Sequence, residues 1–218
     1  MKKSELIIIG GVGVILVLVL LVSNFNISIN IGKAESAKPS QAVAGNQTDS
    51  MAGHHGSGTV DTTIYDGLLG KPAPDFTLED YNGKKISLSG LKGKNVILFF
   101  NEGLMCYPSC WNQMATFGKD EELKSKAEIF NITVDPKNNW GQAITKMPEL
   151  AKATVLFDGA RQASKAYGVL TLPSSMHKGQ FPGHTYIVID KEGIVRYVKD
   201  DPQMAVRNQE MLAEINKL

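Results

Sequence analysis

The sequence lacks an excess of charge of either sign. Its 218 residues include 23 Lys and Arg against 22 Asp and Glu, which gives a formal net charge of +1. A protein that binds nucleic acid by neutralising phosphates needs a surplus of basic side chains. Nucleic acid is therefore not an expected partner. The sequence also lacks internal repeats, so one core of medium size is expected, with additional segments at the ends.

Cysteine is scarce as well, and its placement is unusual. The sequence has two cysteines, Cys106 and Cys110, in one short segment. A disulfide across so short a loop contributes little entropic stabilisation, which argues against a purely structural bridge. At positions i and i+4 of a helix the two side chains face the same side, close enough for a disulfide to form and open. The pair therefore indicates redox chemistry or metal binding.

The segments around the cysteines predict different roles for them. A continuous apolar run of strand length, residues 95–100, comes directly before them, and residues 111–126 can form a helix after them. Cys106 is then near a helix N-terminus, where unpaired N–H groups and the helix dipole stabilise a thiolate. Pro108 fits a first helical turn, whose N–H groups lack partners. We therefore expect Cys106 to be the attacking sulfur and Cys110 the resolving one.

One long apolar run lies near the N-terminus. Residues 6–22 have no charged or strongly polar side chain and follow Lys2 and Lys3. A helix of this length is about 26 Å long, enough to cross a bilayer core of about 30 Å with its flanking residues. The segment behind the run offers a poor signal-peptidase site. We expect an uncleaved single-pass anchor over residues 1–24 in the cytoplasmic membrane, with the N-terminus inside and the rest outside, where disulfides persist.

The remainder divides into a linker and a folded domain. Residues 25–66 have too few large apolar side chains to offset the entropy of ordering, and are expected to be a flexible polar linker. The domain is expected over residues 67–218 and begins with two strands around the Asn82-Gly83 turn. Strands alternating with helices, then a late hairpin and a final helix, predict an α/β fold with a mixed sheet between helices. The further strands are expected at 129–134, 154–157, 185–189 and 194–198, and the further helices at 140–152, 161–167 and 205–217.

Several segments of this domain carry a family resemblance. They are residues 70–78, the Asn82-Gly83 turn before residues 86–88, residues 96–100 and residues 186–193. Over about residues 68–218 the chain resembles the redoxins, the alkyl hydroperoxide reductase and thiol-specific antioxidant family of the thioredoxin-like superfamily. The resemblance implies a thioredoxin-like fold and a thiol-dependent oxidoreductase that requires no cofactor. Its implied partners are proteins with thiols or disulfides, or a small reductant.

The sequence departs from the peroxiredoxins of that family at two places. The segment 101–106 lacks the threonine that precedes their active cysteine, and His184 stands where they have a late arginine. Arginine keeps its charge at every relevant pH, whereas histidine loses it near a pH of about 6.5. The exchange suits a disulfide reductase better than a fast peroxidase. We therefore expect an extracytoplasmic thiol-disulfide oxidoreductase in which His184 assists Cys106 and Cys110, with weak peroxidase activity at best.

A copper chaperone similar to the Sco proteins is the alternative. Those proteins have the same fold, a membrane anchor, two cysteines separated by three residues and a later histidine. Under this hypothesis Cys106, Cys110 and His184 bind Cu(I), which thiolates and imidazole suit. Two differences weigh against it. Trp111 stands where the Sco proteins have a proline, and His184 lies closer to Asp190 than their histidine does to the corresponding aspartate.

Four further residues lie in or near these segments. We expect Glu102 to be a surface carboxylate, with a proton relay as the alternative, and His177 to be exposed and without a role. Trp111 either covers the disulfide or packs into the core. Pro182 resembles the proline of the family's loop opposite the cysteines, which is often cis.

Overall fold

The computed structural model describes residues 58–218. The anchor expected at residues 6–22 and most of the linker expected at 25–66 lie outside this range. Within residues 58–218, no helix combines the length and the apolar character needed to cross a membrane.

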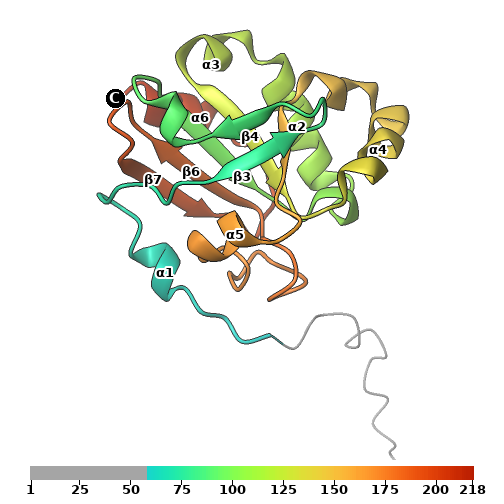
Figure 1. Cartoon of the computed structure of the whole chain (residues 1–218), viewed down its shortest axis with the longest axis horizontal. Coiled ribbons are helices and arrows are strands. Elements are labelled where there is room, and N and C mark those ends of the chain that lie inside the picture. Colours follow the sequence, from blue (N-terminus) through green and yellow to red (C-terminus); the bar gives the residue numbers. More distant parts are fainter. Residues whose placement is uncertain (1–57) are drawn as a thin grey trace, which may run out of the picture. The chain divides into compact units, whose positions relative to one another are not determined.

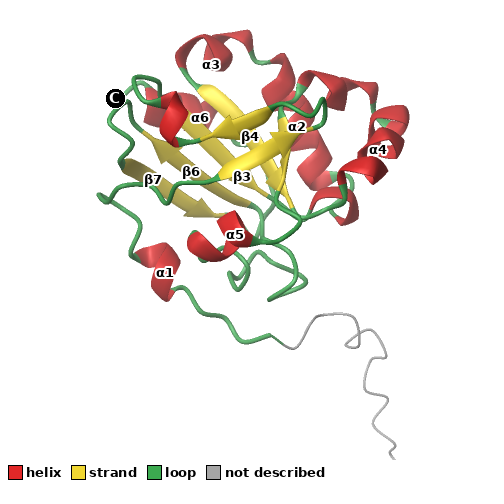
Figure 2. Cartoon of the chain, in the orientation of Figure 1, coloured by secondary structure: helices red, strands yellow, loops and turns green. Residues whose placement is uncertain are grey.

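The domain is built on a seven-stranded mixed sheet with helices on both faces (Figure 1, Figure 2). The strand order is β2-β1-β5-β4-β3-β6-β7; β3, β4 and β5 are parallel, and the outer strands pair antiparallel. The predicted α/β fold with a mixed sheet is therefore confirmed. The strands are β1 (Thr77–Asp80), β2 (Lys85–Ser87), β3 (Val96–Phe100), β4 (Glu128–Thr133), β5 (Val155–Phe157), β6 (Thr185–Ile189) and β7 (Val195–Asp200).

Strand β3 explains why the sequence before the cysteines is uniformly apolar. All five of its side chains are buried. Ile97 and Phe99 belong to the core beneath α2, α4 and α6, whereas Leu98 and Phe100 belong to the core on the other face, which α1 and α5 cover. A strand covered on both faces needs apolar residues at every position rather than at alternate ones.

Two helices predicted as continuous are each broken in the structure. The helix predicted at 111–126 is two helices, because Asp120 leaves the helical conformation and its carboxylate accepts the Leu123 N–H at 3.0 Å, which caps a new helix. The helix predicted at 140–152 stops before Pro148, which begins a 3-10 turn, Pro148–Lys152. The last helix is shorter than the predicted 205–217. The helices are α1 (Thr63–Asp66), α2 (Ser109–Lys119), α3 (Glu121–Lys126), α4 (Trp140–Lys146), α5 (Gln162–Ala166) and α6 (Asn208–Ile215).

Residues on the N-terminal side of the expected domain boundary at residue 67 already contact the domain. The Asp61 N–H donates to the Thr171 carbonyl at 3.3 Å, and the Thr171 hydroxyl donates to the Asp61 carbonyl at 2.7 Å. Tyr65 of α1 is buried in the core that α5 covers. The last residues of the expected linker therefore pack on the domain.

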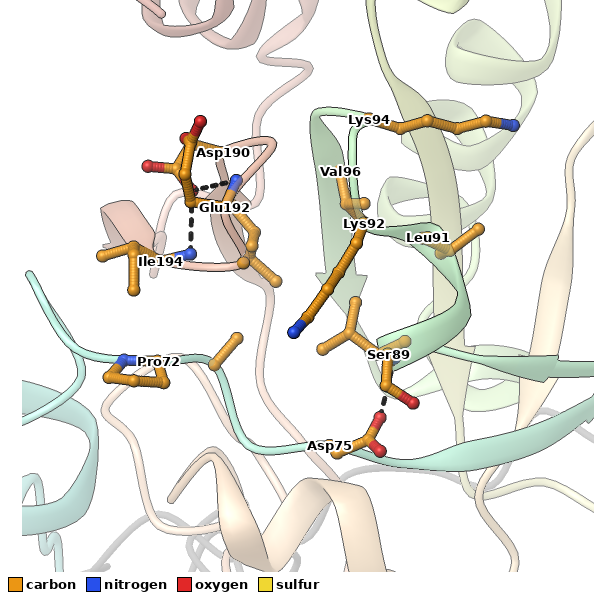
Figure 3. A pocket seen from close by; sticks show the side chains of 14 residues that line it. Pro72, Asp75, Ser89, Leu91, Lys92, Lys94, Val96, Asp190, Glu192 and Ile194 are labelled. Carbon is orange, nitrogen blue, oxygen red and sulfur yellow. Dashed lines mark hydrogen bonds between the residues drawn. The ribbon is translucent and has the colours of Figure 1, made fainter.

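The pairing of β3 with β6 determines what lies at each end of the sheet. The two strands are antiparallel, with Phe100 opposite Thr185. The residues after β3 and those before β6 therefore meet at one end. The other end of β3 has a pocket of about 320 Å³, whose lining includes Lys92, Val96 and Ile194 (Figure 3).

Candidate active site

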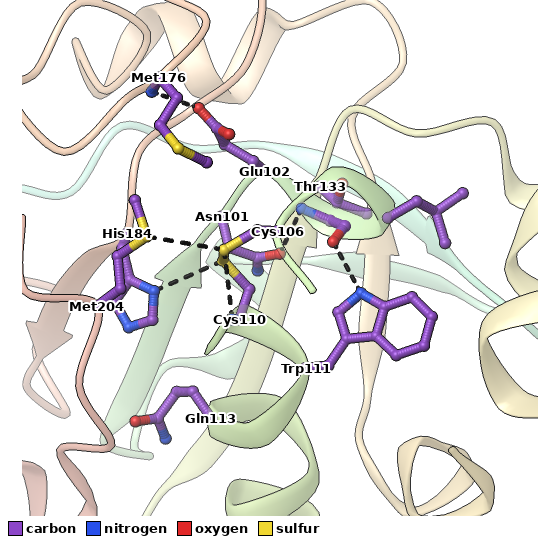
Figure 4. The surroundings of a disulfide bond; sticks show 12 residues. Asn101, Glu102, Cys106, Cys110, Trp111, Gln113, Thr133, Met176, His184 and Met204 are labelled. Carbon is purple, nitrogen blue, oxygen red and sulfur yellow. Dashed lines mark hydrogen bonds between the residues drawn. A yellow bond between two sulfur atoms is a disulfide. The ribbon is translucent and has the colours of Figure 1, made fainter. Parts of the chain in front are cut away.

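Cys106 and Cys110 form a disulfide at the end of β3 (Figure 4). Their Cα atoms are 5.3 Å apart. The helix predicted at 111–126 begins at Ser109, and Cys106 ends the preceding 3-10 turn, Gly103–Met105, so the two cysteines are not at positions i and i+4 of one regular helix. The helix therefore starts between the two cysteines.

Cys106 lies just before the first turn of α2, and the contacts of its sulfur fit the role of attacking thiol. The Cys110 N–H donates to Cys106 Sγ at 3.3 Å. In the reduced protein such a donor favours the thiolate over the thiol. Cys106 is 3% exposed and Cys110 is fully buried, while Met105 and Tyr107 beside Cys106 are 51% and 64% exposed. Of the two cysteines, Cys106 is therefore the one that lies beside exposed side chains.

The 3-10 turn before Cys106 is held from several sides. Gly103 has φ of +57°, and its N–H donates to Asn101 Oδ1 at 2.9 Å. The Leu104 N–H donates to Asp135 Oδ2 at 2.9 Å. Burial raises the pKa of Asp135, and the hydrogen bonds from Thr133 and Leu104 oppose that shift. The turn is thus fixed to the end of β4.

Trp111 is a core residue that also supports this turn. Its ring is buried, and Nε1 donates to the Gly103 carbonyl at 3.0 Å. Tyr107 packs edge-on against the indole, with ring centroids 5.1 Å apart. His184 and Met204 lie on one side of the disulfide and Trp111 on the other (Figure 4). Of the two alternatives for Trp111, packing into the core describes its position.

His184 faces the disulfide from the start of β6. Its Nδ1 is 3.5 Å from Cys110 Sγ, and its Nε2 is 2.8 Å from the Tyr186 hydroxyl. The ring packs edge-on against Phe99 at 4.6 Å between centroids. Burial lowers the pKa of His184 to about 4, and the negative charge of Asp201 only partly opposes this. The imidazole is therefore neutral at neutral pH.

We expect the buried neutral ring of His184 to make the protein sensitive to acid. The folded-state pKa of about 4 lies below the value of about 6.5 for an unfolded histidine. As pH falls from about 6.5 to about 4, the unfolded chain takes up a proton that the folded protein refuses, so the free energy of unfolding decreases by about 3 kcal/mol. Above about pH 6.5 this loss does not occur, and the free energy of unfolding keeps its full value with respect to His184.

Urea unfolding of the wild type and of His184→Gln at pH 7 and pH 4.5 measures this contribution. Asp135 and Asp200, whose pKa values are raised by burial, act in the opposite direction and are common to both proteins. The wild type should lose about 2 to 3 kcal/mol more than the variant between the two pH values. Equal losses in the two proteins would show that His184 is not the titrating group.

Glu102 and His177 differ from the expectations for them. Glu102 is fully buried, and its Oε1 accepts the N–H groups of Met176 at 2.6 Å and His177 at 3.1 Å. Its Oε2 lies 3.2 Å from His177 Nδ1, and His177 is half-buried. The expected surface position of Glu102 is wrong because the loop before β6 folds over it. The cis proline of residues 58–218 is Pro108 rather than Pro182.

Three residues of the site were not predicted from the sequence. Met204 has its Sδ 4.0 Å from Cys106 Sγ and adopts φ of +50°, a conformation uncommon for a side-chain-bearing residue. Tyr186 and Gln113 lie behind His184 and are buried. Of the three, only Tyr186 could have been found from the local sequence. Residues i and i+2 of a strand share a face, and His184 is two positions before Tyr186.

The sulfurs of Cys106 and Cys110 and a ring nitrogen of His184 lie within 4.8 Å of one another. Two sulfurs and an imidazole are a donor set that soft metals accept. Each sulfur is bonded to the other in the disulfide, so this donor set becomes available only on reduction. The site can thus exchange disulfides directly, and it can offer three donors once reduced.

The chain is similar in sequence to peroxiredoxins and to a thiol-disulfide oxidoreductase. Chloroplastic peroxiredoxin Q of Triticum aestivum is 36% identical over 131 residues, which cover 59% of this chain and 57% of that protein. The chain thus spans little more than half the length of the wheat protein. The thiol-disulfide oxidoreductase ResA of Bacillus cereus is 32% identical over 156 residues, which cover 66% of this chain and 82% of that protein.

Similarity to solved structures supports the assignment of the fold, and the match to a family model supports the assignment of the family. Peroxidoxin BcpB of Mycobacterium tuberculosis matches with a TM-score of 0.57 and 22% identity, over 69% of this chain and 97% of that chain. This likeness indicates the thioredoxin-like fold. The model of the AhpC/TSA family matches residues 69–198, more than half of the sequence. The chain therefore belongs to the AhpC/TSA family.

Proposed function

We propose that this protein is a thiol-disulfide oxidoreductase that exchanges disulfides with partner proteins through Cys106 and Cys110. The observation that carries the proposal is the disulfide itself, formed by two cysteines four residues apart at a helix N-terminus. The similarity to ResA, named as a thiol-disulfide oxidoreductase, supports the same reaction. The cysteines supply the redox chemistry, so no cofactor is required.

The reaction proceeds by two exchange steps. In the reductive direction the Cys106 thiolate attacks a partner disulfide, forms a mixed disulfide and releases one partner sulfur as a thiolate. Cys110 then attacks the Cys106 sulfur, closes the intramolecular disulfide and releases the second partner sulfur. The partner gains two electrons and two protons, and the site returns to the oxidised form described above.

The surroundings of the site support exchange with disulfides over rapid peroxide reduction. A peroxidatic thiolate needs a permanent positive charge beside it, and the His184 ring is neutral at neutral pH. The guanidinium of Arg207 is bound to Asp201, with hydrogen bonds of 2.8 and 3.0 Å, and is committed to that carboxylate. Peroxidase activity is therefore expected to be weak.

The test compares two substrates with the reduced full-length protein. A disulfide-bonded test protein should be reduced while the Cys106–Cys110 disulfide forms in equal amount. Hydrogen peroxide should be consumed far more slowly under the same conditions. Rapid consumption of peroxide without reduction of protein disulfides would contradict the proposal and favour a peroxidase.

We further propose that residues 6–22 anchor the protein in the cytoplasmic membrane with the redox domain outside. Support comes from the apolar run and from Lys2 and Lys3 before it. The intact chain should sediment with membranes, and protease added to intact spheroplasts should remove the domain. A soluble form that begins between residues 24 and 50 would instead indicate cleavage.

A Cu(I) carrier is a second candidate, favoured by the proximity of the two sulfurs and the His184 ring. Stoichiometric capture of Cu(I) by the reduced protein, together with no turnover of disulfides, would support it. Turnover of disulfides with only weak copper binding would support the exchange reaction.

A further inference from the structure

A buried chain of hydrogen bonds leads from the His184 ring to the start of α3. His184 Nε2 is 2.8 Å from the Tyr186 hydroxyl, which donates to Gln113 Oε1 at 2.8 Å. Gln113 Nε2 donates to Asn208 Oδ1 at 2.8 Å, and Asn208 Nδ2 donates to Asp120 Oδ2 at 2.6 Å. The members come from β6 and the residue before it, from α2 and α6, and from the residue between α2 and α3, so the chain depends on the assembled fold.

The direction of each bond is set by groups that act in only one way. The Asp120 carboxylate accepts, so the Asn208 amide directs its NH₂ group toward it and its oxygen toward Gln113. Gln113 therefore directs its own oxygen toward Tyr186. The Arg207 backbone N–H, which can only donate, points at the same Gln113 oxygen at 2.7 Å. Two independent groups thus give one orientation for Gln113.

The Tyr186 hydroxyl has one hydrogen and two acceptors for it. These are Gln113 Oε1 at 2.8 Å and the Ala205 carbonyl at 3.1 Å, and neither can donate. The hydroxyl hydrogen is therefore donated to these acceptors, and toward His184 Nε2 the hydroxyl oxygen can only accept. A neutral imidazole has one N–H, so a proton on Nε2 leaves a lone pair on Nδ1. That lone pair faces Cys110 Sγ at 3.5 Å.

We propose that Tyr186, oriented by Gln113, holds His184 in the Nε2–H tautomer, so that Nδ1 accepts the Cys110 thiol proton when the mixed disulfide is resolved. The inference rests on the proposed function and identifies Tyr186 as a positioning residue. In the step, the proton moves from Cys110 sulfur to Nδ1, and a bond forms between the sulfurs of Cys110 and Cys106. The bond from Cys106 to the partner breaks. The partner leaves as a thiolate, which takes up the proton that the imidazolium gives back.

This arrangement also distinguishes the two cysteines. Cys106 Sγ faces an N–H donor, which favours its thiolate, whereas Cys110 Sγ faces an acceptor, which favours its thiol until attack begins. The opposite tautomer would place a donor against Cys110 and remove the difference. The tautomer therefore matters for the order in which the sulfurs react.

The direct test is the ¹⁵N chemical shifts of the His184 ring in the oxidised full-length protein. The wild type should show a protonated Nε2 and an unprotonated Nδ1. Tyr186→Phe removes the acceptor for Nε2–H but keeps the ring, which stacks on Phe99 at 4.8 Å between centroids. In this variant the Nδ1–H tautomer should appear. Tyr197→Phe is the matched control, because Tyr197 lies on the neighbouring strand β7 and its hydroxyl donates to Glu210 of α6, so its loss should leave His184 unchanged.

Stopped-flow kinetics give the functional result. In Tyr186→Phe, attack by Cys106 on a test disulfide should keep the wild-type rate, while resolution by Cys110 should slow by about tenfold or more, since general base catalysis commonly contributes at least that much. A wild-type ring protonated at Nδ1, or a Tyr186→Phe ring that stays fully in the Nε2–H form, would overturn the inference. A correct tautomer in a protein that exchanges no disulfides would instead overturn the proposed function and the proton transfer, and would leave only the assignment of the tautomer.

Discussion

Replacing Cys110 with serine is expected to convert the protein into a trap for its partners. Cys106 can still attack a partner disulfide, but no second thiol remains to release the mixed disulfide. The N–H that points at Cys106 Sγ belongs to the backbone of residue 110, so it survives the substitution. Cys106 therefore keeps its stabilising donor, and the covalent adduct should accumulate.

The adducts are measured on non-reducing gels and assigned by mass spectrometry, with a reducing agent as the control that dissolves them. The matched variant Cys106→Ser should trap almost nothing, because Cys110 is fully buried and its sulfur faces His184. Equal trapping by the two variants would mean that the roles of the cysteines are assigned wrongly.

Gly103→Ala is expected to be among the most destabilising single substitutions near the site, with a loss of about 3 to 4 kcal/mol in the free energy of unfolding. A side chain at its φ of +57° costs about 1 to 2 kcal/mol. The added Cβ would lie 1.7 Å from Asp135 Oδ2 and 2.2 Å from Thr133 Oγ1. Asp135 must then move and lose its hydrogen bonds from Leu104 and Thr133, each of which contributes about 1 kcal/mol.

Gly93→Ala is the matched control for this substitution. Gly93 has φ of +87°, but no atom lies within 4 Å of the position that its Cβ would take. Only the backbone cost remains, about 1 to 2 kcal/mol. Urea unfolding of both variants separates the two contributions. Similar losses at Gly103 and Gly93 would show that the contacts with Asp135 and Thr133 are not important for stability.

Much of the fold could be predicted because its signals are local. The uniformly apolar β3 and the turn between β1 and β2 depend on neighbouring residues, and both were placed correctly. The helix breaks at Asp120 and Pro148 also had local signals, a capping carboxylate and a proline, but one continuous helix was predicted across each of them. Helix ends were therefore the weakest part of the prediction.

The site was less predictable because it depends on contacts between distant segments. His184 meets Cys110 only through the pairing of β3 with β6, and its expected position came from a family resemblance rather than from spacing. Glu102 is buried, and its carboxylate accepts hydrogen bonds from backbone N–H groups more than 70 positions away in the sequence. No local pattern encodes such a contact. The partners of Tyr186 on α2 and α6 were invisible for the same reason.

The two outermost strands of the sheet limit how this protein can associate with other chains. Strand β2 has only three residues and begins with Lys85. The start of β7 is covered by the segment around Pro72, and the rest of β7 carries Arg196 and Lys199. An incoming strand would have to remove these cations from water, which disfavours strand addition and aggregation along the sheet. Under the proposed function, partners are then expected to dock at the loops around Cys106, where a sulfur can be reached without extending the sheet.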